Sequence, residues 1–264
     1  MPSSSSSSPD VRRRVLPLPK GAADVPMFNP DSSVVSDIIP SANFGERNNG
    51  MVPDMIVLHY TGMQTAEAAV TRLRDPEAKV SAHYLVEEDG TVCRLVDESK
   101  RAWHAGRSHW RETTDVNSAG IGIEIVNPGH EWGYRPFTDE QIDALVPLVA
   151  AIKKRHGITR GNIVGHSDIA PTRKRDPGEL FPWSRLARLR LALPRPTRNL
   201  MDPMWTQGGF LLALERFGYD VADAMAAIVA FQRRFRPELI DGEIDAECRM
   251  ILLALLLPKP QGDE

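Results

Sequence analysis

The middle of the chain alternates short apolar runs with stretches that mix apolar and polar residues. The runs MIVLHY (55–60), GIGIEIVN (120–127) and NIVGH (162–166) predict buried strands. The stretch SAHYLVEEDGTVCRLV (81–96) predicts two more strands in a hairpin, because Asp89–Gly90 is a strong turn signal.

Two stretches in the same region have helical spacing. In 65–75 the apolar residues share one face of a helix. Residues 138–157 give a stronger prediction, because Thr138 and Gln141 form a capping box and Gly157 stands where helices usually end. Strands interleaved with helices predict an α/β domain with a mixed central β-sheet flanked by helices.

The C-terminal part of the chain has a different pattern. Residues 193–203, LPRPTRNLMDP, have the composition of a linker. Three helical patterns follow, at about 206–217, 222–235 and 246–257. We expect a small three-helix domain over 204–258 that folds separately, so that a chain ending near residue 195 keeps its chemistry. The alternative is that Phe231 and Phe235 pack on the preceding domain.

The N-terminal part and the composition narrow the class of protein. Residues 1–44 show no clear period, so we expect a tail and an irregular segment before a domain that spans 45–192. The net charge of −3 gives no case for binding nucleic acid. No apolar run approaches the roughly 20 residues that span a bilayer. Cys93 and Cys248 are far apart and show no metal or redox spacing.

Three candidate metal ligands lie at the ends of predicted strands or just after them. His59 ends the first strand, His166 ends the last, and Asp176 follows ten residues later. Two imidazoles and one carboxylate are a ligand set for catalytic zinc that leaves a fourth position for water. Spacing alone is weak support, because the histidines are far apart in the chain. The alternative is that each is a hydrogen-bonded histidine at a strand end.

Hydrolysis at zinc also needs a proton carrier and a cation or hydrogen-bond donor for the oxyanion. Glu124 interrupts an apolar strand, where a carboxylate is costly unless it is paired or functional. Lys174 precedes Asp176 by two residues, so both side chains can reach one pocket. By itself, Lys174 is better explained as a solvated lysine between Arg173 and Arg175.

Five motifs occur in order along the chain: LHYTGM, VSAHYLVEEDGTV, AWHAGRSHW, VNSAGIGIEIVNPGH and GHSDIAPTRKRDPG. Over about residues 45–190 the chain resembles the zinc-dependent N-acetylmuramoyl-L-alanine amidases of the amidase-2 type, relatives of phage lysozyme amidases and peptidoglycan recognition proteins. The C-terminal AIVAFQRRFRPELIDGEIDAECRMIL resembles a three-helix peptidoglycan-binding module.

The resemblance implies roles for particular residues. One zinc ion per chain is implied, bound by His59, His166 and Asp176. Glu124 matches the family's catalytic carboxylate, and Lys174 matches its transition-state lysine.

Further positions separate this chain from one branch of the family. Phage-type relatives carry a tyrosine before the hairpin histidine and a cysteine as third ligand, where this chain has Ala82 and Asp176. His104 is implied as a substrate contact and His83 as a structural residue. We expect His130 to be a surface residue without a role in the site.

The implied activity is hydrolysis of the amide between the lactyl group of N-acetylmuramic acid and L-alanine, in peptidoglycan or anhydro-muropeptides. A non-catalytic recognition protein is the first rival, but such relatives lose the third ligand that this chain keeps. Another zinc hydrolase, such as a peptidase, would need an HExxH-like helix, and none is present. The run VLPLP is too short for an export signal. We therefore expect a cytoplasmic protein, whereas the wall-binding module argues for the periplasm.

Overall fold

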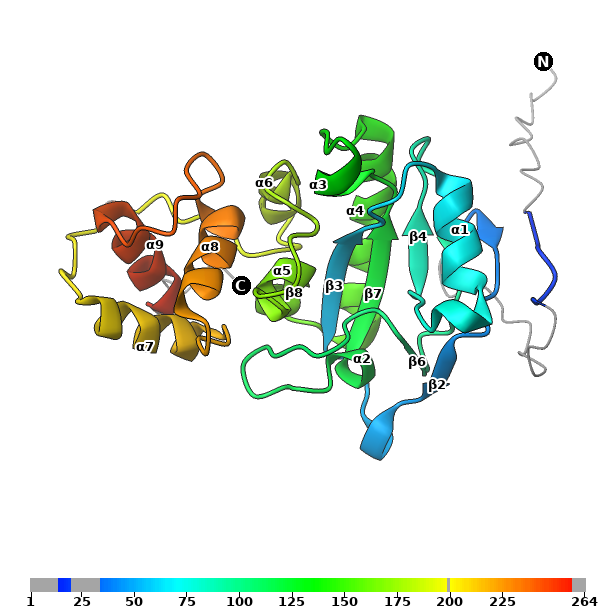
Figure 1. Cartoon of the computed structure of the whole chain (residues 1–264), viewed down its shortest axis with the longest axis horizontal. Helices are drawn as coiled ribbons and strands as arrows, with labels where there is room; N and C mark the ends of the chain where they lie inside the picture. The colour runs from blue at the N-terminus through cyan, green and yellow to red at the C-terminus, as the bar shows by residue number, and fades with distance from the viewer. Residues whose placement is uncertain (1–13, 20–33, 199, 258–264) are drawn as a thin grey trace, which may run out of the picture.

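The structure of the chain is a computed structural model that describes residues 14–19, 34–198 and 200–257. Most of the expected N-terminal tail, at 1–13 and 20–33, lies outside the described residues. The described chain has a larger domain built around a β-sheet and a group of three helices at one end of the molecule (Figure 1).

A six-stranded mixed sheet forms the centre of the larger domain, in the order β1-β5-β4-β7-β3-β8 (Figure 1). Its strands are β1 (Asp37–Ile38), β3 (Met55–Tyr60), β4 (Tyr84–Val86), β5 (Val92–Arg94), β7 (Gly120–Ile125) and β8 (Ile163–Gly165). Strands β4 and β5 are antiparallel and form the predicted hairpin, whereas the other neighbouring pairs of this sheet are parallel. The mixed central sheet expected from the sequence is confirmed.

The two faces of the sheet have different partners. Ile56 and Leu58 of β3 belong to one buried cluster with Leu145 and Leu148 of α4 (Asp139–His156), which covers one face. Because side chains alternate along a strand, the residues between them project from the opposite face. That opposite face carries the candidate site.

The remaining elements of the larger domain are short. They are the antiparallel pair β2 (Phe44–Glu46) and β6 (Lys100–Ala102), the helices α1 (Ala66–Arg74), α2 (Val116–Ala119), α3 (Gly129–Trp132), α5 (His166–Ile169) and α6 (Trp183–Arg188), and the 3-10 turns η1 (Asn48–Gly50), η2 (Pro76–Ala78) and η3 (Arg160–Asn162). In the part of the chain that the structure describes, no helix has the length and hydrophobicity needed to cross a membrane.

The strongest helix prediction is matched closely by α4. The Thr138 side chain accepts a hydrogen bond from the backbone N–H of Gln141, and the Gln141 side chain accepts one from that of Thr138. Gly157 ends the helix in the left-handed conformation, at φ 66°. The segment expected to be irregular differs from the prediction, because Asp37 and Ile38 pair with β5. A strand of two residues is too short to give a recognisable period.

The C-terminal helices are α7 (Gln207–Phe217), α8 (Ala224–Phe235) and α9 (Ala246–Leu256), close to the predicted ranges. Their buried side chains pack on one another and also belong to a cluster that reaches the sheet domain. Phe231 and Phe235 belong to the same buried cluster as Met55 and Val57 of β3. One apolar cluster therefore includes side chains of both regions, and separate folding of the three-helix region stays a prediction.

Polar contacts also join the two parts. The Trp110 ring packs edge-to-face on Tyr219, with 5.2 Å between ring centroids. Asp168 of α5 is fully buried and accepts a hydrogen bond of 2.6 Å from the Tyr219 hydroxyl. Its other carboxylate oxygen lies 3.8 Å from Nε of Arg234, whose guanidinium stacks on Trp183. The C-terminal helices thus contact the short helix that begins at His166.

Candidate active site

The register of β3 and β7 brings two predicted site residues side by side. In this parallel pair His59 lies opposite Glu124, so both side chains project from the face away from α4. Two residues earlier on that face, a Cβ at Gly122 would stand 2.4 Å from Cγ of His104. A glycine within this strand is therefore what leaves room for the His104 ring.

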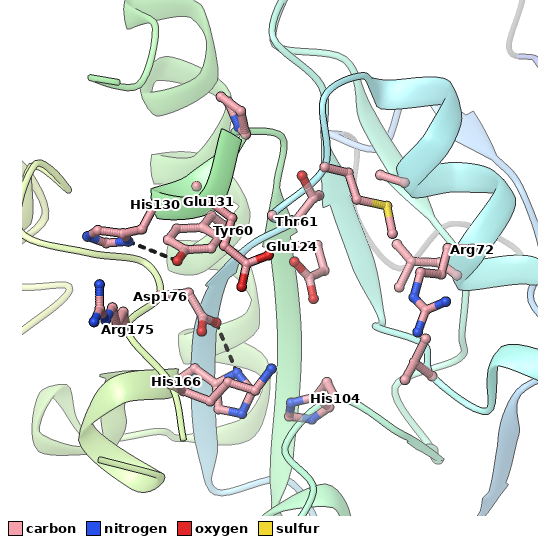
Figure 2. A pocket seen from close by; sticks show the side chains of 18 of the residues that line it. Tyr60, Thr61, Arg72, His104, Glu124, His130, Glu131, His166, Arg175 and Asp176 are labelled. Carbon is pink, nitrogen blue, oxygen red and sulfur yellow. Dashed lines mark hydrogen bonds and ion pairs between the residues drawn. The ribbon is translucent and has the colours of Figure 1, made fainter. Parts of the chain in front are cut away.

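Three side chains from different segments converge beside Glu124. His59 comes from the end of β3. His166 comes from the first turn of α5 directly after β8, and Asp176 comes from the following loop (Figure 2). Nδ1 of His59 lies 2.9 Å from Nδ1 of His166, and the two atoms lie 3.0 and 2.9 Å from Oδ2 of Asp176. The backbone N–H of Ser167 donates to the Asp176 carbonyl at 2.8 Å, which closes the loop onto α5.

The contacts of Nε2 in His59 and His166 indicate which nitrogen of each ring is free to bind a metal ion. Nε2 of His166 lies 3.2 Å from the carbonyl of Ala105, which can only accept, so this nitrogen carries the proton and Nδ1 keeps its lone pair. Nε2 of His59 lies 3.1 Å from Nδ1 of His104. When His59 donates there, two lone pairs and a carboxylate oxygen face one another. Such a convergence of acceptors fits a cation, and the ligand types fit zinc.

The protonation states of His59 and Asp176 also suit a metal ion. Burial, followed by the neighbouring His166, lowers the pKa of His59 to about 4, so His59 is neutral at pH 7. Burial alone would raise the pKa of Asp176, but the interactions with His166 and His59 outweigh it and hold this pKa well below its ordinary value. A neutral imidazole and an ionised carboxylate are the protonation states that metal binding requires.

Glu124 is a carboxylate without a hydrogen-bond partner for its inner oxygen. Within the described residues, Oε2 of Glu124 is buried and contacts no donor. Burial raises the pKa of Glu124 well above its ordinary value, the nearby Asp176 raises it further, and Lys174 opposes the change. A carboxyl group whose pKa is raised toward neutrality is suited to accept and return a proton.

A cavity of about 660 Å³ opens over these groups (Figure 2). Its volume is in the range of small-molecule sites, roughly 300–1,000 Å³. Its lining includes the predicted residues His104, Glu124, His166, Lys174 and Asp176. Of the six residues predicted for the site, only His59 does not line the cavity, because it is buried behind the others.

Several residues of the cavity were not predicted for the site, and two of them contact each other. Tyr60 and His130 line it, and the Tyr60 hydroxyl lies 2.9 Å from Nδ1 of His130. His130 was expected only at the surface. Its place three residues beyond the GIGIEIVN run, near the strand end that carries the site, was a signal that could have found it. His83, expected to be structural, is fully buried and accepts a hydrogen bond from the Gly122 backbone N–H.

Fold and site together define a class of protein, a hydrolase whose pocket at one face of a mixed sheet has three residues that could hold a metal ion. The sequence pattern of N-acetylmuramoyl-L-alanine amidases matches residues 49–179. N-acetylmuramoyl-L-alanine amidase AmiD of Escherichia coli (strain K12) is 39% identical over 229 residues, which are 76% of this chain and 82% of that protein. The chain belongs to the N-acetylmuramoyl-L-alanine amidase family, and it is an enzyme of that family.

Two further comparisons agree with this assignment. The structure of E. coli AmiD in complex with the substrate anhydro-N-acetylmuramic acid-L-Ala-D-gamma-Glu-L-Lys is similar, with a TM-score of 0.70, 34% identity and coverage of 82% of this chain and 98% of that chain. The 1,6-anhydro-N-acetylmuramyl-L-alanine amidase AmpD of Haemophilus influenzae is 33% identical over 165 residues, 56% of this chain and 88% of that protein. The similarity to AmiD thus extends over a larger share of this chain.

Proposed function

We propose that this amidase uses one zinc ion per chain, bound by His59, His166 and Asp176, to hydrolyse the amide between the lactyl group of N-acetylmuramic acid and L-alanine. The observation that carries the proposal is the convergence of two imidazole nitrogens and one carboxylate oxygen beside an unpartnered glutamate. A bound zinc ion would supply Lewis acidity, which polarises a carbonyl oxygen and acidifies water.

Glu124 is proposed as the general base and acid. Its raised pKa and its place beside His59 suit it to take a proton from the attacking water and to pass that proton to the leaving amine of L-alanine. Because the reaction returns the proton, Glu124 ends each cycle in its starting state.

Lys174 and His104 are proposed to act around the scissile bond. Lys174 lines the same cavity as Glu124, where its ammonium group can stabilise negative charge that develops on the carbonyl oxygen. His104 contacts His59 through Nδ1, while its Nε2 is buried without a partner among the described residues. We propose that this nitrogen donates a hydrogen bond to the bound substrate.

We propose muropeptides as the substrate class, because the similar AmiD structure contains an anhydro-muropeptide. The arginines that line the cavity, Arg72, Arg173 and Arg175, offer positive charge to the carboxylates of a stem peptide. We further propose that the region 204–258 helps to bind peptidoglycan. Comparing cleavage of soluble anhydro-muropeptide with cleavage of intact sacculi measures which form of the substrate is preferred.

The central experiment combines metal analysis with product identification. Purified chain should contain about one equivalent of zinc and release free peptide from an anhydro-muropeptide. His59→Ala and His166→Ala should lose most of the metal and the activity. Full zinc content in both variants would exclude this ligand set, and a product cut elsewhere in the muropeptide would exclude the proposed bond.

A further inference from the structure

We propose that Arg233 of α8 is a positioning residue for the substrate cavity, acting through Glu179 and His130 on Tyr60. The inference rests on the proposed function for the identity of the ligand that fills the cavity. It gives the C-terminal helices a part in substrate binding that does not require them to touch the substrate.

The first contact joins α8 to the loop after Asp176. Nε of Arg233 lies 3.6 Å from Oε2 of Glu179, and only 10% of the Arg233 side chain is exposed. In the described residues this Nε has no hydrogen-bond partner, so Glu179 is the acidic group that faces it. A buried guanidinium near one carboxylate restricts where that carboxylate can lie.

The second contact joins Glu179 to the cavity wall. Both carboxylate oxygens of Glu179 lie 3.2 Å from Nε2 of His130. A carboxylate accepts, so Nε2 carries the proton and Nδ1 of His130 accepts from the Tyr60 hydroxyl at 2.9 Å (Figure 2). The hydrogen bonds therefore run in one direction, from Tyr60 through His130 to Glu179.

The packing leaves these rings few alternative positions. Tyr134 stacks on His130, with 4.4 Å between centroids and 23° between ring planes. A Cβ at Gly129 would stand 2.6 Å from the Tyr60 ring, so the backbone of α3 lies directly against that ring. When the carboxylate that orients His130 moves, the Tyr60 hydroxyl loses its acceptor, and the wall of the cavity changes shape.

The expected defect lies in binding rather than chemistry. Tyr60 and His130 line the cavity but are not among the proposed metal ligands, base or oxyanion cation. Loss of Arg233 should therefore raise KM while kcat and zinc content stay close to those of the wild type. If Arg233 served only to attach α8, its loss would instead lower thermal stability and kcat together, without a selective change in KM.

The test uses the full chain and a soluble anhydro-muropeptide. Arg233→Ala should raise KM about tenfold, the effect of weakening the charge-assisted hydrogen bond between His130 and Glu179, and change kcat less than about threefold. Arg233→Lys should have a KM close to that of the wild type, because lysine retains the positive charge. The matched control is Arg216→Ala, an exposed arginine of α7, which should leave both constants unchanged.

A double-mutant cycle separates action through Glu179 from independent effects. In a Glu179→Gln background, Arg233→Ala should raise KM no further. Additive effects, or a loss of kcat without a change in KM, would overturn the proposal. If Arg233→Ala does not fold, Glu179→Gln and Arg233→Lys still test the same contacts. Glutamine is nearly isosteric with glutamate, and lysine retains the positive charge of arginine.

Binding measured without turnover keeps this proposal distinct from the proposed function. Calorimetric titration of Glu124→Gln with the muropeptide should give a Kd that weakens by the same factor when Arg233→Ala is added. A wild-type chain that binds the muropeptide but cleaves nothing would refute the proposed activity alone. If the wild type is active but Arg233→Ala does not change the Kd in the Glu124→Gln background, the positioning role alone is refuted.

Discussion

The chemistry of the site depends on which atom of each side chain faces the pocket. His59 and His166 turn Nδ1 toward Asp176, and their outer nitrogens contact His104 and a backbone carbonyl. Each outer contact fixes the orientation of a ring, and a ring fixed in this way could hold a metal ion with little further ordering. Three predictions concern single residues around the proposed metal ligands, namely Glu124, Lys174 and His104.

Glu124→Gln should retain the fold and the zinc but lose activity by roughly 100- to 10,000-fold, because glutamine keeps the shape of the side chain and cannot accept a proton. Metal analysis and steady-state kinetics on one preparation measure both properties. A variant within about threefold of the wild-type rate would remove Glu124 from the mechanism.

Lys174→Ala should lower kcat by roughly 100- to 1,000-fold with a much smaller rise in KM, because the cation acts on charge that develops only in the transition state. Arg175→Ala is the matched control, since it removes a neighbouring positive charge from the same cavity. Equal losses of kcat in the two variants would mean that general positive potential, not Lys174 in particular, supports the reaction.

His104→Phe should weaken zinc binding by about 10- to 100-fold, because the ring remains over Gly122 while the hydrogen bond to His59 is lost. Titration against a competing chelator gives the affinity directly. If the affinity is unchanged, His104 serves the substrate alone.

Several elements of the larger domain are joined by another buried carboxylate, which is not one of the proposed site residues. Glu98, in the segment between β5 and β6, accepts hydrogen bonds from Tyr84 of β4 and from Arg155 near the end of α4. His156, the last residue of α4, also contacts it at 2.6 Å. These contacts fix one end of α4 against the sheet.

Glu98 should make the stability of the protein sensitive to acid. Burial would raise its pKa, but hydrogen bonds from His156, Tyr84 and Arg155 outweigh burial and lower the pKa to about 2. Since the folded-state pKa lies below the unfolded one, near 4.5, the stabilisation is complete above about pH 4.5 and is lost as the pH falls toward 2. The contribution is on the order of 3 kcal/mol.

Urea unfolding of Glu98→Gln at pH 7 and pH 3 measures this effect. The variant should be less stable than the wild type at pH 7, and the difference should shrink at pH 3. Glu215→Gln on the exposed face of α7 is the control and should change neither value. A difference independent of pH would attribute the loss to packing rather than to charge.

The sequence predicts some elements and site residues well, but it does not predict contacts between segments that are distant in the chain. The capping box and Gly157 set the ends of α4 because those signals are local, and the motif residues around His59 and His166 could be matched one by one. The Arg233–Glu179–His130 contacts could not be predicted, because they join three segments far apart in the chain. Whether Phe231 faces its own helices or a neighbouring domain is likewise decided by tertiary packing, which a single helical stripe does not reveal.

At the scale of the whole molecule, the two predicted domains share one apolar cluster and several polar contacts. A chain that ends near residue 195 would expose part of that cluster and leave the buried Asp168 without its Tyr219 and Arg234 contacts. The separate folding expected from the linker composition stays a prediction, which truncation tests.

Truncation after residue 195 should destabilise the remaining chain by on the order of 5 kcal/mol or more, because exposing each large apolar side chain costs about 1.5–3 kcal/mol. Thermal unfolding, zinc content and cleavage of a soluble muropeptide should all decline together. A truncated chain with wild-type melting temperature and soluble-substrate activity would restore the view of two independent units.

The shared cluster also has a consequence for the order of events during protein synthesis. The loop that carries Asp176 leaves the ribosome before α8, whose last residue is Phe235. At roughly 5–20 residues per second, seconds pass between the two. Until Tyr219 and Arg234 have both been made, the Asp168 side chain lacks these two contacts. The amidase therefore reaches its final packing only after translation of most of the chain, whereas an enzyme with an autonomous N-terminal catalytic domain could fold before its tail is made.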